Sequence, residues 1–381
     1  MPWRESTAVS QRLEFVVLAS LAGANISELC RQFGVTRRTG YKWLARADSD
    51  DPYLLADRSR RPLLSPGLTP VEVVAAVRAM REENPAWGGR KIRRVLQNET
   101  SLLVPAASTI TEILRREGLL EARPEPSPVV WQRFQEEAPN DLWQIDFKGP
   151  VSLASGGVQA LGILDDHSRF NLCLAACSDQ RRETVQSQLV RVFERYGLPL
   201  RMLMDNGPPW GSAGQTPSGS SQTRLSAWLI RRGISVSHGR PYHPQTQGKE
   251  ERFNRTLIDE VLSRTTAYDR YELQLAFDRW REVYNFRRPH ESLNLDTPGS
   301  RYTPSPRALP VTLPPIDYQS TDDVLRVRAT GRIRFRGQDF PVSKGLAGEP
   351  VALRASGDGT WDIYYCHQKV GNIDLSCTED L

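Results

Sequence analysis

The sequence predicts a chain of several domains, all-α at the N-terminal end, α/β in the centre and all-β at the C-terminal end. Three observations predict this. Apolar residues recur at helical spacing up to about residue 121, form strand-like runs from 141, and alternate with arginines from 324. Proline-rich stretches separate these regions. A chain of 381 residues also exceeds one ordinary domain, so two to four domains are expected.

The composition is 39% hydrophobic and 25% charged, as in soluble globular proteins. The sequence has no apolar run long enough for a membrane span and no segment with the features of a secretory signal, so we expect a cytoplasmic protein without a membrane partner. Its five scattered cysteines fit reduced thiols. The net charge of +5 is mild, but the basic side is dominated by clustered arginines, which suit phosphate contacts.

Residues 1–48 predict three helices, at Ser10–Ala22, after a cap at Ser27, and after a cap at Thr36. The stretch from Ile26 to Arg46 has the pattern of a helix-turn-helix, whose second helix enters the DNA major groove. The alternative is a small helical bundle with a solvated basic face. In the DNA-binding interpretation, the residues facing DNA are Arg37, Arg38, Thr39 and Lys42.

A linker at 49–68 leads to a second helix-turn-helix unit at 69–121. Thr69 and Glu72 form a capping-box pattern before a helix at 70–83. Helices at 90–98 and after a cap at Ser108 follow. Two such units in tandem provide a means of spanning a long DNA site. A proline-rich linker at 122–140 ends this region.

Residues 141–295 predict an α/β domain in the order three strands, helix, strand, helix, strand, helix. That order is typical of an RNase H-like domain, although many α/β folds begin similarly. The expected strands are 141–151, 158–164, 170–176, 201–204 and 234–237, and the expected helices are 182–196, 223–232, 248–264 and 269–285.

After a linker at 296–322, residues 323–381 predict a small β-barrel-like domain with a hairpin turn at 357–359. Arginines alternate with apolar residues there, so one face is basic. Arg332 and Arg334 are expected to contact DNA. The alternative is a β-module whose exposed face is merely charged.

Two aspartates are the first candidates for catalytic chemistry. Asp146 lies mid-strand between large apolar neighbours and is expected to be partly desolvated, so its charge needs a partner such as a metal ion. Asp205 ends an apolar run and begins Asp-Asn-Gly, which taken alone signals a turn.

Two adjacent glutamates, Glu250 and Glu251, lie in the first turn of a helix expected to begin near Gly248. Its buried stripe contains Phe253 and Leu257, and both glutamates lie within about a right angle of that stripe. Periodicity therefore does not choose between them. The alternative is that both are solvated and favoured there by the helix dipole.

Several motifs occur together in order, and as a set they are specific. Their combination resembles bacterial insertion-sequence transposases of the acidic-triad (DDE) type with a retroviral-integrase-type catalytic core, a resemblance that covers most of the chain. The matching pieces are WQIDFK (143–148), LDDHSRF (164–170), MDNG (204–207), GISVSHGRPYHPQTQGKEERFNRTL (233–257) and YNFRRPHESL (284–293).

The resemblance implies a catalytic, metal-binding triad of Asp146, Asp205 and, through the Gly-Lys-x-Glu-Arg pattern, Glu251. It implies two Mg²⁺ ions, replaceable by Mn²⁺, with Asp146 bridging both. Two such ions about 3.5–4 Å apart activate the attacking oxygen and stabilise the leaving one in phosphoryl transfer. The sequence departs from retroviral integrases in the wider interval of 45 residues between Asp205 and Glu251, and it lacks their zinc-binding domain.

Basic residues around this triad are expected to contact DNA phosphates, although ordinary solvated helix charge is an equal alternative. They are Lys249, Arg252 and Arg255. His243 is expected either to orient the scissile phosphate or to form part of the turn before Pro244. Asp166 is expected to be a turn residue outside the triad.

The expected function is therefore a transposase that binds element ends in double-stranded DNA, cleaves their 3′ ends and joins them to a target. Acting on two ends implies at least a homodimer on DNA, in the cytoplasm and nucleoid of a bacterium. A DNA-binding regulator that descends from a transposase and lacks catalysis is the alternative, and an RNase H-like nuclease is a third possibility.

Overall fold

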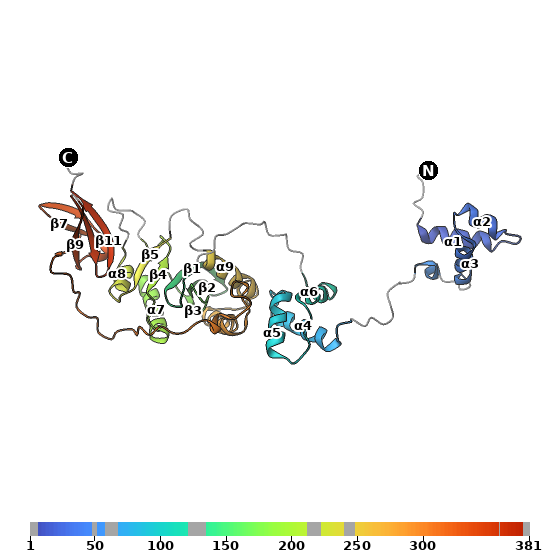
Figure 1. Cartoon of the computed structure of the whole chain (residues 1–381), viewed down its shortest axis with the longest axis horizontal. Coiled ribbons are helices and arrows are strands. Elements are labelled where there is room, and N and C mark those ends of the chain that lie inside the picture. Colours follow the sequence, from blue (N-terminus) through green and yellow to red (C-terminus); the bar gives the residue numbers. More distant parts are fainter. Residues whose placement is uncertain are drawn as a thin grey trace. The chain divides into compact units, whose positions relative to one another are not determined.

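A computed structural model describes residues 7–47, 52–57, 68–120, 135–211, 222–239, 248–357 and 359–375. The chain divides into two compact units, Met1–Leu68 and Thr69–Leu381 (Figure 1). Within the described ranges, no helix has the length and apolar character needed to cross a membrane.

The first unit contains three helices, α1 (Ala8–Ala19), α2 (Ile26–Gln32) and α3 (Arg37–Arg46), and a short 3₁₀ turn at Pro52–Leu55. Phe15, Cys30 and Trp43 form its buried centre. The Thr36 hydroxyl accepts from the Thr39 N–H at 3.2 Å, which confirms the predicted cap of α3. The predicted cap at Ser27 is wrong, because the Asn25 side chain accepts from the first N–H groups of α2 instead.

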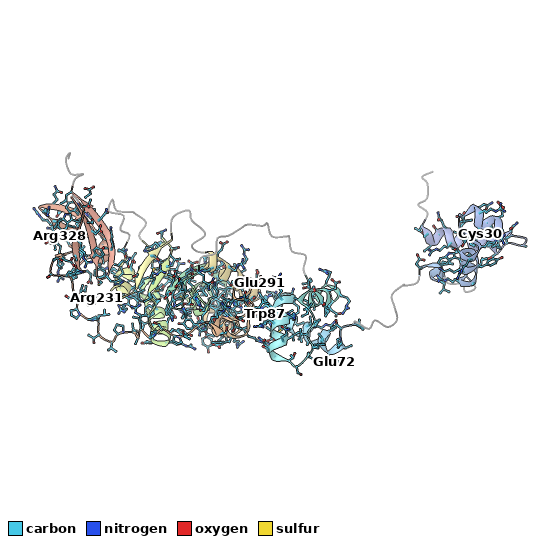
Figure 2. The ribbon with its side chains drawn as sticks, viewed as in Figure 1. Cys30, Glu72, Trp87, Arg231, Glu291 and Arg328 are labelled. Atoms are coloured by element: carbon cyan, nitrogen blue, oxygen red, sulfur yellow. The ribbon has the colours of Figure 1, made fainter. Side chains whose placement is uncertain are left out.

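The second unit begins with three more helices, α4 (Val71–Glu83), α5 (Gly89–Glu99) and α6 (Ala107–Arg116). They enclose Trp87, which is 1% exposed (Figure 2). The predicted caps at Thr69 and Ser108 are wrong: Pro70 and Ala106 hold the N-cap positions without side-chain capping bonds.

These three helices contact the following domain through ion pairs. Arg287 donates to Glu99 at 2.7 Å and also contacts Glu83. Arg94 pairs with Asp296 at 3.1 Å. Because these groups are partly exposed, we expect the contact to weaken as salt is added.

The central domain contains a five-stranded mixed sheet in the order β3-β2-β1-β4-β5. β1, β2 and β3 are antiparallel neighbours, whereas β4 runs parallel to both β1 and β5. This arrangement resembles the RNase H fold and confirms the predicted α/β class. The strands are β1 (Leu142–Leu153), β2 (Gly156–Asp165), β3 (Asn171–Cys177), β4 (Arg201–Met204) and β5 (Ser235–His238).

Helices cover both faces of this sheet (Figure 1). On one face pack α7 (Arg182–Tyr196) and α8 (Arg224–Ile230). On the other pack α9 (Gly248–Leu257) and α10 (Arg270–Glu282), which continue as π-helical turns at Ile258–Leu262 and Val283–Arg287. Short 3₁₀ turns follow at Glu291–Leu293 and Pro298–Ser300.

Glutamine side chains occupy the free hydrogen-bonding groups at both edges of the sheet. Gln274 of α10 accepts from the Ala176 N–H at 2.8 Å and donates to the Leu174 carbonyl at 3.0 Å. At the opposite edge, Gln368 accepts from the Val236 N–H and donates to its carbonyl, both at 2.8 Å. These contacts shield edge strands that would otherwise present unpaired backbone groups to another chain.

The C-terminal region is all-β and antiparallel, which confirms the predicted class. A four-stranded sheet has the order β11-β10-β9-β6, and β7 and β8 form a separate hairpin. The strands are β6 (Asp323–Arg326), β7 (Arg332–Phe335), β8 (Gln338–Pro341), β9 (Pro350–Gly357), β10 (Thr360–Tyr365) and β11 (Gln368–Asp374), with a 3₁₀ turn at Lys344–Leu346.

Part of the range predicted as the third linker packs on the central domain. The Tyr302 ring stacks on Phe170 with centroids 4.3 Å apart, and its hydroxyl donates to Asn140 at 2.9 Å. The Ser305 N–H donates to the Tyr196 carbonyl at 2.8 Å. These contacts hold the segment against β3 and α7.

Candidate active site

Asp146 lies within β1, and Asp205 directly follows β4, the adjacent parallel strand. Gln144 of β1 is in register with Leu203 of β4, and each aspartate lies two residues further along its strand direction. Parallel neighbours carry equivalent positions side by side, so the fold brings together two carboxylates that are far apart in sequence.

The surroundings of Asp146 penalise its charge. Burial raises the pKa of this carboxyl group, and the neighbouring Asp205 raises it further. Asn254 of α9 partly offsets this by donating to Asp146 Oδ2 at 3.3 Å. The Asp205 Oδ1 atom accepts from the Gly207 N–H at 2.8 Å, so the Asp-Asn-Gly turn also orients this side chain.

The two glutamates of α9 are placed differently. Glu250 is 5% exposed, and burial together with the charges of Asp146 and Asp205 raises its pKa well above the usual value. The Glu251 side chain is 68% exposed and lies 3.8 Å from Arg255. The structure therefore brings Glu250 to the aspartates and does not bring Glu251 to them, although the motif selects Glu251.

The chemistry of this carboxylate group suits a divalent cation with oxygen ligands. The charge of Asp205 contributes to the raised pKa of Asp146 and of Glu250, and a bound cation relieves such repulsion. Within the described ranges, no three His, Cys, Asp or Glu side chains are placed so that they could hold a metal ion together. Mg²⁺ does not require three protein ligands, because it usually retains several waters and shares ligands with substrate phosphates.

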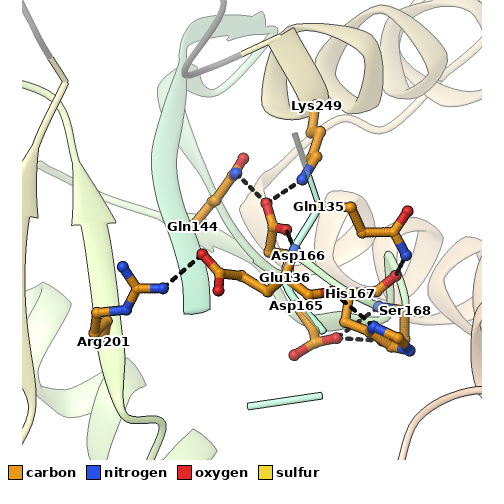
Figure 3. A network of polar contacts seen from close by, with 9 residues as sticks. All are labelled: Gln135, Glu136, Gln144, Asp165, Asp166, His167, Ser168, Arg201 and Lys249. Atoms are coloured by element: carbon orange, nitrogen blue, oxygen red, sulfur yellow. Dashed lines mark hydrogen bonds and ion pairs between the residues drawn. The ribbon is translucent and has the colours of Figure 1, made fainter. Parts of the chain in front are cut away.

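Asp166 is the residue whose importance sequence reasoning missed. It occupies the predicted turn after β2, yet it is 1% exposed. Its carboxylate accepts from the Glu136 N–H at 2.9 Å and from Gln144 Nε2 at 2.8 Å, and it also contacts Lys249 (Figure 3). The double aspartate after a buried strand was the available signal, but turn aspartates are usually solvated.

The basic residues predicted to contact DNA around the carboxylates lie in different environments. Lys249 is directed at Asp166, with 19% of its side chain exposed. Arg252 is exposed, and Arg255 lies beside Glu251. His243 lies outside the described residues.

The predicted DNA-binding residues in the terminal regions lie largely at the surface. On α3, Arg37, Arg38 and Lys42 are exposed and Thr39 is half-buried. On β7, Arg332 and Arg334 are exposed and occupy one face of the strand. Arg332 also donates to the Asp339 carbonyl at 2.7 Å, which holds part of its guanidinium on β8.

Comparison with known families finds a matching model in each major part of the chain. An integrase core domain matches residues 136–244, and a further integrase core domain model matches 232–298. The C-terminal domain of the IS481 family of transposases matches 322–381. A helix-turn-helix domain matches 11–62 and a homeodomain-like domain matches 39–114.

Individual relatives are identical to the chain at about a quarter of the aligned residues or fewer. A protein named as a transposase for insertion sequence element IS5376 in Geobacillus stearothermophilus is 21% identical over 95% of this chain and 88% of its own length. An IS407 protein of Burkholderia multivorans is 24% identical over 60% of this chain and 80% of its own length. The Gag-Pol polyprotein of baboon endogenous virus is 26% identical over 54% of this chain, but only 11% of the polyprotein is covered.

Solved structures give weaker matches. The catalytic core domain of HTLV-2 integrase in complex with magnesium aligns with a TM-score of 0.32 and 15% identity, over 44% of this chain and all of the other. A chain of the simian T-cell lymphotropic virus intasome aligns with a TM-score of 0.36 and 16% identity, over 72% of this chain and 93% of the other.

Proposed function

Because the chain combines an integrase core domain with the C-terminal domain of IS481-family transposases, we propose that it is a metal-dependent DNA transposase. In this proposal it binds the ends of a mobile element, cleaves their 3′ ends and joins them to target DNA. The observation that carries the proposal is that Asp146 in β1 and Asp205, just after the parallel strand β4, are brought side by side, with the buried Glu250 of α9 beside both.

Asp146 and Asp205 are the proposed first two metal ligands, and the glutamate pair of α9 supplies the third. Packing supports Glu250, whose carboxyl group is buried against both aspartates. The Gly-Lys-x-Glu-Arg pattern supports Glu251. In the first case, Glu250 would hold the cation in its ionised form; in the second, the first turn of α9 would have to rotate to bring Glu251 inward.

When bound, two Mg²⁺ ions supply Lewis acidity to the attacking and leaving oxygens of the phosphodiester. The chain's own part is positional: β1 and β4 fix the two aspartates, and Asn254 fixes the Asp146 carboxylate. Since the attacking group is water or a 3′-hydroxyl, no covalent protein–DNA intermediate is needed. Arg252, Arg255 and, if it contacts the scissile phosphate, His243 are the proposed DNA contacts beside the carboxylates.

DNA recognition is proposed to rest on the two helix-turn-helix units. In the first of them, α3 is the helix that enters the major groove, and it carries Arg37, Arg38, Thr39 and Lys42. Arg332 and Arg334 on β7 add phosphate contacts from the C-terminal domain. Since each transposition joins two element ends, the active species is proposed to contain at least two copies of the chain.

The test uses full-length protein, labelled DNA that carries the element ends, and Mg²⁺. We expect 3′-nicked and joined products from the native chain, and loss of both from Asp146→Asn and Asp205→Asn with end binding retained. Glu250→Gln and Glu251→Gln are the matched pair. If only one of these two glutamate variants loses both DNA products, that glutamate is the third ligand. Activity in all four variants would overturn the proposed catalytic site.

The same assay separates the competing functions. A DNA-binding regulator would bind the ends and give neither nicked nor joined product, with or without the substitutions. A nuclease of the same fold would give nicked product without joining. The transposase proposal requires the nicked 3′ end to appear covalently attached to target DNA.

A further inference from the structure

The Asp166 side chain is buried and accepts hydrogen bonds from three different segments of the chain. Its donors are the Glu136 N–H before β1, the Gln144 amide in β1 and the Lys249 ammonium group in α9. Burying a carboxylate is costly unless it is paired and hydrogen-bonded, and removing one partner of such a group is strongly destabilising. Asp166 therefore links these three segments of the chain.

Two of these three donors stand next to the proposed metal ligands. Gln144 is two residues before Asp146 on the same face of β1, and Lys249 immediately precedes Glu250 (Figure 3). Asp166 thus connects the strand that carries one ligand to the helical turn that carries another. It does so from β2's end, without belonging to the carboxylate group itself.

The first turn of α9 depends on contacts from outside the helix, such as the one between Lys249 and Asp166. The first four N–H groups of a helix have no partner within the helix, so an unsupported first turn frays. In α9 this turn contains Gly248, Lys249 and both glutamates. Successive helical side chains project about 100° apart, so fixing Lys249 on Asp166 also fixes the directions in which Glu250 and Glu251 point.

We propose that the Asp166–Lys249 ion pair is a positioning device that sets the rotation of α9's first turn and thereby turns Glu250 toward Asp146 and Asp205. This inference rests on the proposed metal site with Glu250 as its third ligand. Neither residue contacts the metal or DNA in this role, and Lys249 is assigned here to Asp166 in place of the DNA phosphate contact predicted from the sequence. Gln144 is the supporting donor that keeps Asp166 in place.

The variant Lys249→Met removes the charge while keeping a long apolar stem, and Lys249→Arg restores the cation. Loss of an outer residue that orients a metal ligand typically lowers metal affinity or activity by roughly 10- to 100-fold. We expect Lys249→Met to raise the Mg²⁺ concentration for half-maximal cleavage by about that factor. The rate at saturating Mg²⁺ and the binding of element ends should remain near native, and Lys249→Arg should recover most of the metal affinity.

A direct readout is Mn²⁺ binding to the DNA-free protein, followed by the loss of the free-ion electron paramagnetic resonance signal. The matched control is Arg354→Met, which breaks the pair with Asp322 in the C-terminal region, where the Asp322 side chain is likewise buried at 2% exposure. Equal Mn²⁺ affinity in Lys249→Met and Arg354→Met would overturn the inference.

A double variant separates positioning from folding. Asp166→Asn alone leaves Lys249 without its anion, whereas Asp166→Asn with Lys249→Met removes both charges. We expect the double variant to unfold at a higher urea concentration than Asp166→Asn, yet to bind Mn²⁺ as weakly as Lys249→Met. Native Mn²⁺ affinity in the double variant would contradict the positioning role. If instead Asp146→Asn and Asp205→Asn leave Mn²⁺ binding unchanged, it is the proposed metal site that fails.

Discussion

Gly162 controls how closely α9 approaches the strand that carries Asp146. It lies in β2 directly opposite Asp146 in the antiparallel ladder. A Cβ atom at this position would lie 3.2 Å from Cε1 of Phe253, which is closer than an ordinary carbon–carbon contact of about 3.5–4.0 Å. Gly162→Val must therefore push the Phe253 ring, and α9 with it, away from the sheet.

The structure gives the scale of the effect. Restoring an ordinary contact requires a displacement of about 0.3 Å. Asn254 Nδ2 is 3.3 Å from Asp146 Oδ2. The same displacement takes that contact to about 3.6 Å, where it ceases to be a hydrogen bond. Overpacking of this kind costs about 1–3 kcal/mol of folding free energy.

The assay combines urea unfolding, followed by tryptophan fluorescence, with Mg²⁺ titration of end cleavage. Gly157→Val is the matched control, because Gly157 lies in the same strand and a Cβ there meets no atom within 4 Å. We expect Gly162→Val to unfold at lower urea and to need more Mg²⁺ than Gly157→Val. If the two variants behave alike, Gly162 does not set the approach of α9, and the reasoning is refuted.

Because burial and Asp205 raise the pKa of Asp146, the contribution of Asp146 to stability is present below about pH 4 and is lost as the pH rises through its pKa in the folded protein. Asp146→Asn should flatten this fall in stability, measured by urea unfolding with EDTA present, and an unchanged pH profile would contradict the assignment. Arg287→Met should speed amide hydrogen exchange at Val283–Arg287, because it removes the ion pairs of Arg287 with Glu83 and Glu99, and added salt should have the same effect on the native chain. Equal exchange in the variant and the native chain would show that these ion pairs do not stabilise this segment. Gln368→Ala should expose the edge of β5 and increase concentration-dependent aggregation, measured by light scattering, whereas Gln368→Glu, which keeps one acceptor, should have a smaller effect. If neither variant aggregates more than the native chain, the Gln368 contact does not protect this edge.

Local patterns were sufficient to predict most elements of the central domain. The helix Arg182–Tyr196 and the strand Arg201–Met204 have the bounds that their apolar periodicity predicts. Their signals are strong because each buries one regular stripe or run against the sheet. Helix starts were predicted less well: Thr36 caps α3 as expected, whereas Thr69 and Ser108 cap nothing. In the structure, Pro70 and Ala106 hold those two N-cap positions without a side-chain cap.

The sequence by itself determined the class of each region, the order of the elements and, through strand pattern and motif, the candidacy of Asp146 and Asp205. The tertiary structure decided what pairs across strands and helices. Both glutamates lie near the same helical stripe, so only the rotation of α9 against the sheet turns Glu250 inward and Glu251 outward. Asp166 has the sequence of a turn residue, and its role arises from partners at 136, 144 and 249 that only the fold brings together. A sequence pattern reports the direction of a side chain along its own element, whereas a buried charge is stabilised by groups from other elements.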